Sequence, residues 1–121
     1  MIDHVGINVV DLARSRKFYE AALGPIGYKA LMEFPEGVGF GRERPDFWIA
    51  LRKPVSTGVH LCFAVDRRQA VRDFHAAALA AGGKDNGAPG LREHYHPAYY
   101  GAFVLDPDGN NAEVVCHTPE K

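Results

Sequence analysis

The feature that most constrains the fold is a repeat within the chain. The segment HVGINVVDLARSRKFYEAAL, which starts at His4, aligns without a gap with HLCFAVDRRQAVRDFHAAAL, which starts at His60. Phe18 then aligns with Phe74, and the offset of 56 positions (60 − 4) is close to half of the 121 residues. A repeat of this length predicts two similar structural units.

Each copy predicts the same order of elements. A strand with alternating apolar residues comes first, and a helix follows with apolar residues at three- and four-residue spacing. Short strands come next: YKALMEF, VGFG and DFWIAL in the first copy, and GAFVL and AEVVCH in the second. The unit is β-α-β-β-β, with GLREHYHPAYY as a longer insertion in the second copy. We therefore expect one α+β domain over residues 1–121, with modules over about 1–56 and about 57–121.

A carboxylate, Glu113, stands in the apolar strand that follows the predicted turn DPDGN. One sheet face must pack against its helix and be apolar, so alternation sends His4, His60 and Glu113 to the opposite, concave face. Two histidines and a carboxylate form a common metal-ligand set that leaves further positions for water or substrate. A buried carboxylate also needs a partner. The sequence thus predicts a divalent ion (Fe, Mn, Ni, Zn or Co) on these three ligands.

Other polar residues are expected on this face or in the insertion. Arg52 is either a bidentate anion ligand or a solvated strand end. The insertion is either a substrate wall or lid, or a loop that covers apolar surface or makes a dimer contact. Cys62 is expected to be a small buried hydrophobic residue, and His117 a surface residue. The candidate general acids or bases are Tyr100 and His96, and the candidate substrate contacts are Asn8, Trp48, Arg52, Arg92 and Tyr99.

Composition excludes several functional classes. The net charge is −1 with 24% charged residues, which gives no reason to expect a nucleic-acid partner. No apolar run is long enough to span a bilayer, and the N-terminal segment lacks the features of a signal peptide. Two cysteines form no disulfide framework, so we expect a cytoplasmic protein.

Three segments resemble the vicinal oxygen chelate superfamily of glyoxalase, fosfomycin-resistance, bleomycin-resistance and extradiol dioxygenase proteins. DHVGINVVDLARSRKFYEAALGPIGYK resembles its first-module signature, GVHLCFAV its second-module strand, and FVLDPDGNNAEV its last hairpin, which ends in a ligand glutamate. The resemblance implies paired βαβββ modules that form a curved mixed sheet with a metal cleft, assembled as a homodimer. It also implies that His4, His60 and Glu113 are the ligands, and that His4 can come from a different subunit than the other two.

The chain departs from one branch of this family at Ala50. Glyoxalase I enzymes have a fourth ligand, a glutamate or glutamine, in the strand that here reads IAL. Ordinary lactoylglutathione lyase activity is therefore disfavoured. We expect a lyase, thiol transferase or dioxygenase that chelates vicinal oxygens of a small substrate, with an anionic group or a thiol conjugate as possible features of that substrate. The alternative is a metal-independent protein that sequesters a drug or metabolite, as bleomycin-resistance relatives do.

Overall fold

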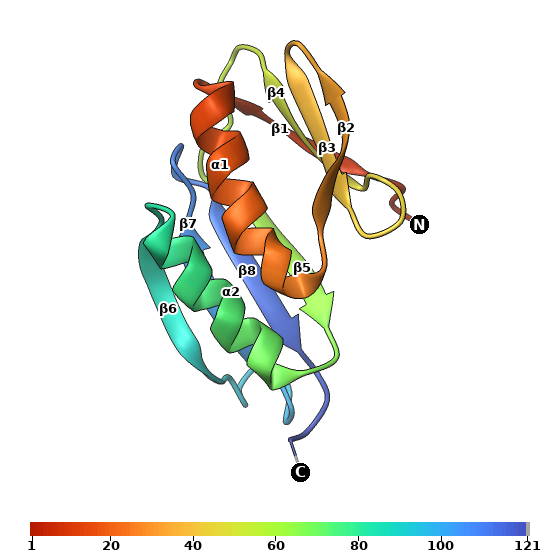
Figure 1. Cartoon of the computed structure of the whole chain (residues 1–121). Helices are drawn as coiled ribbons and strands as arrows, with labels where there is room; N and C mark the ends of the chain where they lie inside the picture. Colours follow the sequence, from red (N-terminus) through yellow and green to blue (C-terminus); the bar gives the residue numbers. More distant parts are fainter. Residues whose placement is uncertain (121) are drawn as a thin grey trace.

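The computed structural model describes residues 1–120, which form two four-stranded sheets and two main helices (Figure 1). The first module contains β1 (Val5–Val9), α1 (Leu12–Leu23), the 3-10 helix η1 (Gly24–Ile26), β2 (Lys29–Phe34), β3 (Gly37–Gly41) and β4 (Phe47–Leu51). The second contains β5 (His60–Val65), α2 (Arg68–Ala80), β6 (Lys84–Leu91), β7 (Tyr100–Leu105) and β8 (Asn111–Cys116).

The two sheets have the same topology. Their strand orders are β1-β4-β3-β2 and β5-β8-β7-β6, and in each the first strand pairs in parallel with the last strand of its module. The remaining pairs are antiparallel, so each sheet is mixed. The prediction of an α+β fold with two β-α-β-β-β modules is confirmed. The structure has two separate four-stranded sheets, however, where a single curved sheet was expected.

Both helices pack against a shared apolar core. Helix α1 begins after Asp11, whose carboxylate accepts a hydrogen bond from the Arg14 backbone N–H at 3.0 Å. Its buried face includes Phe18 and Leu23, and Phe74 of α2 belongs to the same cluster. The helices lie side by side (Figure 1). Neither is long and apolar enough to cross a membrane.

The β-α-β-β-β unit implies one further strand in the second copy, but the sequence does not show which segment forms it. The segment KDNGAPGL forms β6, although its glycines and proline favour turns. Among residues 1–120 this strand pairs only with β7, and it has irregular register at Gly87 and Gly90. An edge strand tolerates Pro89 because one row of its backbone groups has no strand partner.

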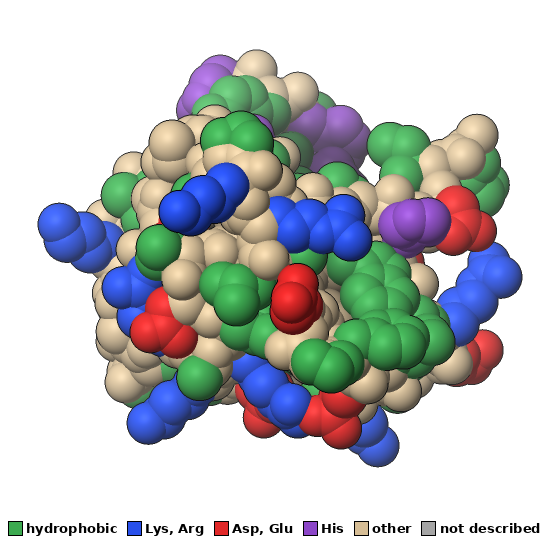
Figure 2. Space-filling model, turned by 90° about the horizontal axis from the view of Figure 1, so that it is seen from above, with side chains coloured by type: hydrophobic (Ala, Val, Ile, Leu, Met, Phe, Trp, Pro, Cys, Tyr) green, Lys and Arg blue, Asp and Glu red, His purple; other side chains and the backbone are tan. Residues whose placement is uncertain are grey.

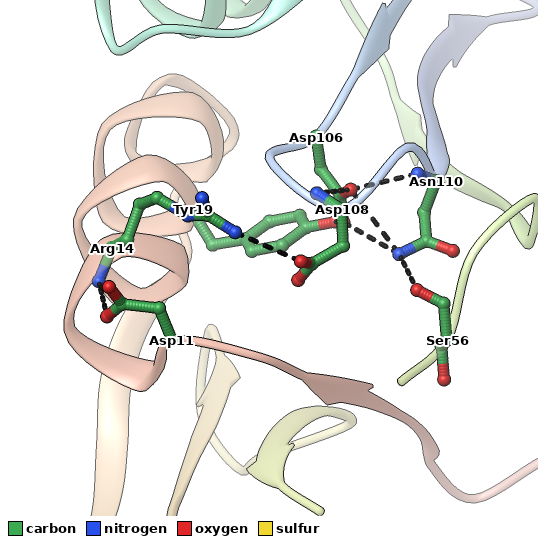
Figure 3. Close-up of polar contacts among 7 residues, drawn as sticks. All are labelled: Asp11, Arg14, Tyr19, Ser56, Asp106, Asp108 and Asn110. Atoms are coloured by element: carbon green, nitrogen blue, oxygen red, sulfur yellow. Dashed lines mark hydrogen bonds and ion pairs between the residues drawn. The ribbon is translucent and has the colours of Figure 1, made fainter. Parts of the chain in front are cut away.

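The predicted DPDGN turn connects the two modules (Figure 3). Tyr19 Oη of α1 donates a 2.6 Å hydrogen bond to Oδ2 of Asp106. The other carboxylate oxygen of Asp106 accepts from the backbone N–H of Asn110 at 2.8 Å, and Asn110 Nδ2 donates to the carbonyl of Ser56 at 3.0 Å. Gly109 has φ +88°, which favours glycine at this position. The turn thereby fixes the start of β8 relative to α1 and to the segment between the modules.

Candidate functional site

A buried carboxylate lies between two polar partners in the second module. Glu113 of β8 is 1% exposed, and its Oε1 lies 2.7 Å from Nε2 of His60 on β5. Its other oxygen, Oε2, accepts a hydrogen bond from Tyr99, which precedes β7. The His60 side chain is 55% exposed, so the pair of His60 and Glu113 is open to solvent on one side.

The local structure of the sheet builds this cluster. In β5 the exposed residues His60 and Cys62 alternate with the buried residues Leu61 and Phe63, which pack in the core. Because β5 and β8 pair in parallel with Cys62 opposite Glu113, the carboxylate is on the same face as the histidine.

Gly101 of β7 leaves the space that this cluster needs. A Cβ atom at this position would lie 3.2 Å from Glu113 Oε2 and 3.2 Å from Cε1 of Tyr99. Both distances are tighter than ordinary van der Waals contact, so a larger residue would displace the carboxylate or the phenol.

The cluster holds two protonated groups beside the carboxylate. Burial and the nearby charge of Glu113 raise the pKa of the Cys62 thiol to about 12. Burial and the hydrogen bond to Glu113 likewise raise the pKa of Tyr99. Both groups are therefore proton donors at neutral pH. Cys62 as a whole residue is exposed, so the expectation of a buried hydrophobic residue is wrong.

The first module carries a pocket of about 720 Å³ on the corresponding sheet. His4 lines it, and the nearest polar partner of this histidine is Asp3, with Nδ1 and Oδ1 2.8 Å apart. Figure 2 looks down on this end of the molecule and shows hydrophobic side chains gathered in a patch, with Lys/Arg and Asp/Glu side chains beside it. The other lining residues include Asn8, Phe34, Glu36, Trp48, Ala50 and Arg52.

The structure brings together two of the three expected metal ligands. His60 and Glu113 are in contact, whereas His4 lines the pocket of the first module and contacts Asp3. Within residues 1–120 of one chain, no group of three or more His, Cys, Asp or Glu side chains is placed to hold a metal ion. An imidazole nitrogen and a carboxylate oxygen that converge at 2.7 Å fit a divalent cation as part of its ligand set.

The two candidate general acids or bases lie apart from Glu113. Tyr100 Oη accepts a 3.1 Å hydrogen bond from Arg72 Nε of α2, so this side chain is on the helix-covered face. The His96 ring packs edge-on against exposed His117, with centroids 4.9 Å apart, and His117 packs against Tyr99 at 5.3 Å. Tyr99, and not Tyr100, is thus the tyrosine that contacts Glu113.

Two of the expected substrate contacts, Arg92 and Asn8, donate hydrogen bonds to backbone carbonyls. Arg92 donates from Nη1 to the carbonyls of Gly90 and Gly101, both at 2.7 Å, and from Nη2 to that of Ala88 at 2.9 Å. These bonds give Arg92 a structural role at the junction of β6 and β7. Asn8 donates from Nδ2 to the carbonyl of Pro54 at 3.0 Å and also lines the pocket of the first module.

Sequence reasoning missed two residues of these sites. Phe34 stacks on Trp48 in the pocket of the first module, with centroids 6.1 Å apart and planes inclined by 23°. The sequence predicts Gly101 only as part of a strand. Strand alternation over Lys29–Phe34 could have indicated Phe34, whereas the requirement for Gly101 depends on the position of Tyr99, which the sequence does not specify.

Comparisons with known proteins are consistent with this fold. Residues 1–114 match the family model described as Glyoxalase/Bleomycin resistance protein/Dioxygenase superfamily. A solved glyoxalase/bleomycin resistance protein from Albidiferax ferrireducens is 31% identical, with a TM-score of 0.83 over 94% of this chain and 96% of that one. The comparison with curated proteins found no match.

Two further solved structures show the same fold at lower identity. A glyoxalase/bleomycin resistance protein/dioxygenase family enzyme from Burkholderia phytofirmans is 22% identical, with a TM-score of 0.74 over 95% of this chain and 97% of that one. A lactoylglutathione lyase from Agrobacterium tumefaciens is 18% identical, with a TM-score of 0.70 over 95% and 92%. The resemblance seen in the sequence is confirmed: the chain belongs to the glyoxalase/bleomycin resistance protein/dioxygenase superfamily.

Proposed function

We propose that two copies of this chain form a metalloenzyme in which each metal site is shared between subunits. His60 and Glu113 of one subunit and His4 of the other would hold the divalent ion. The observation that carries the proposal is the 2.7 Å contact between His60 and buried Glu113, together with the location of His4 on the other module. A buried carboxylate with an exposed imidazole beside it has the chemistry of an incomplete metal site.

The symmetry of the chain supports a shared site. His4 directly precedes β1 in the first module, and His60 on β5 and Glu113 on β8 belong to the equivalent strands of the second. A twofold dimer that places the first module of one copy against the second module of its partner would complete two identical sites. Leu51 at the end of β4 is 42% exposed and supplies apolar surface that such an interface would bury.

The residues around the proposed metal site would have different roles. Tyr99 fixes Oε2 of Glu113, which leaves Oε1 beside His60 as the oxygen available to a cation. Cys62 lies opposite Glu113 in the pairing of β5 with β8 and would be a further polar group on the same face. A divalent ion would supply Lewis acidity toward two vicinal substrate oxygens. Ala50 adds no ligand, so positions for those oxygens would remain open.

The open positions favour some reactions over others. A lyase, thiol transferase or dioxygenase needs two adjacent sites for substrate oxygens, whereas lactoylglutathione lyase chemistry calls for the fourth ligand that Ala50 does not provide. The second candidate is metal-independent sequestration of a drug or metabolite. The observation that favours it is the 720 Å³ aromatic pocket, which exists in one chain without a complete ligand set.

Subunit complementation tests the shared site. Wild-type dimer should bind Co²⁺, Ni²⁺ or Zn²⁺ by calorimetry, and His4→Ala and His60→Ala should each lose this binding. After the two variants are mixed, unfolded and refolded together, metal binding should return, because a mixed dimer contains one site with all three ligands. Absence of metal binding by wild-type protein would leave the sequestration function, and failure of the mixture alone would show that the site is not shared.

A further inference from the structure

We propose that the pocket of the first module binds a planar conjugated anion of the aromatic carboxylate class. The ring would lie against Phe34 and Trp48, and the carboxylate would pair with Arg52. This inference deepens the proposed function and rests on it, because His4 lines the same pocket and the ligand would be the substrate of the shared site.

The aromatic wall of the pocket is built by three adjacent strands. Phe34 at the end of β2 and Trp48 in β4 stack with their planes inclined by 23°, so the two rings present nearly parallel surfaces. Phe34 is 55% exposed, and Trp48 is only partly buried. Ring surfaces exposed in a concave pocket favour a flat partner, because offset stacking needs parallel planes.

Gly39 of β3 leaves room for the indole of Trp48 in this position. The residue pairs with Trp48 across the ladder, and a Cβ atom at Gly39 would lie 2.8 Å from both Cη2 and Cζ2 of the indole. Any side chain here would therefore push Trp48 away from the sheet. The glycine lets the indole lie close against the strand, which fixes one wall of the pocket.

The charge of the pocket comes from Arg52, which follows β4 directly. Within residues 1–120, no hydrogen bond or ion pair uses its guanidinium, in contrast to Arg92, whose donors are bound to three carbonyls. A guanidinium with free donors matches a carboxylate in bidentate geometry. Glu36 also lines the pocket, but no ion pair joins it to Arg52 in the described part of the chain. Its charge should weaken the binding of an anion.

The chain provides a direct probe of this pocket. Trp48 is the single tryptophan, so one indole N–H signal in the NMR spectrum reports on the wall. We would titrate metal-free protein in a chelator with 2-naphthoate, and compare it with neutral 2-naphthamide and with the saturated ring analogue decahydro-2-naphthoate. Affinities come from calorimetry, and the indole signal locates the binding.

The expected result is that 2-naphthoate shifts the Trp48 signal and binds about tenfold more tightly than either comparison compound, because only it offers both the ring and the charge. Arg52→Gln and Phe34→Ala should each weaken it about tenfold, and Glu36→Gln should tighten it. Arg67→Gln, in the second module, is the matched control and should leave the affinity unchanged. Both Phe34 and Arg52 are exposed, so these variants should fold.

Equal binding of the three compounds, an unmoved indole signal, or unchanged affinity in Arg52→Gln would each overturn the proposal. Because the titration is carried out without metal, its failure is separate from that of the shared metal site. Restored metal binding in mixed dimers with no preference for 2-naphthoate would remove this inference and keep the proposed function. A clear preference without metal binding would instead support a sequestering protein for the same ligand class.

Discussion

Tyr99 donates a hydrogen bond to the Glu113 oxygen that does not contact His60. The two partners thus occupy different oxygens of one buried carboxylate, and the carboxylate has little freedom to rotate. Loss of a group that orients a ligand in this way typically lowers metal affinity. Tyr99 is therefore a positioning residue for the proposed metal site.

Tyr99→Phe should weaken metal binding by about 10- to 100-fold. The substitution removes the hydroxyl group and keeps the ring that packs against His117, so the change acts mainly on Glu113. Tyr100→Phe is the matched control, because its hydroxyl bonds to Arg72 on the other face of the sheet. Metal titration of both variants, with the absorption spectrum of bound Co²⁺, makes the comparison. Equal affinities in the two variants would show that Tyr99 does not orient the ligand.

A second prediction concerns the link between the modules. Tyr19 is fully buried, and Tyr19→Phe removes its bond to Asp106 without changing the shape of the core. We expect a loss of about 1.5–3 kcal/mol in the free energy of unfolding, since the acceptor is a carboxylate. Tyr95→Phe, at an exposed position, should change it by less than about 0.5 kcal/mol. Urea unfolding measures both, and a similar small change in the two variants would contradict the prediction.

Arg92 carries the third prediction. Arg92→Lys should lower the free energy of unfolding by about 1–2 kcal/mol, because one ammonium group cannot replace bonds to the carbonyls of Ala88, Gly90 and Gly101. Arg52→Lys has no such bonds to lose and should be close to neutral. Thermal unfolding compares the two, and hydrogen exchange in β6 should rise only in the first. A neutral Arg92→Lys would show that these bonds do not stabilise the junction of β6 and β7.

The sequence predicts the architecture well because it depends on periodicity. The repeat that begins at His4 and His60 specifies two similar modules, and strand alternation correctly places His60 and Glu113 on one face. The distance between the two modules, in contrast, could not be predicted from the sequence. Alternation assigns His4 to an equivalent face of its own sheet, but it contains no information on how two sheets in one chain are spaced, or on a second chain.

The finer features of the site depend on contacts that have no local signal. Tyr99 and Tyr100 are neighbours at the start of a strand, so their faces are decided by where the strand begins. Arg92 was expected to contact substrate, but the carbonyls that bind it belong to β6, a strand whose glycines and proline resemble a loop. The carbonyl contacts of Arg92 could be predicted only once that edge strand was known.

The last prediction concerns pH. Tyr28 packs edge-on against Phe63 of the other module, with centroids 5.5 Å apart, and donates a 2.9 Å hydrogen bond to Asp46. Burial, and then this bond, raise the pKa of Tyr28 to about 12 from the ordinary value of 10.0. The folded state therefore holds the proton more tightly than the unfolded chain does. The resulting stabilisation is fully present below about pH 10 and is lost as the pH rises through about 12.

Tyr28→Phe removes this titration and keeps the ring contact with Phe63. The difference in free energy of unfolding between wild type and Tyr28→Phe should be constant up to about pH 9. At about pH 11.5 it should be smaller, because wild type has lost part of the stabilisation from Tyr28. Titrations of other groups are common to both proteins and cancel in the difference. Urea unfolding at a series of pH values gives the measurement. A difference that stays constant across this range would mean that Tyr28 loses its proton at the same pH in the folded and unfolded chains.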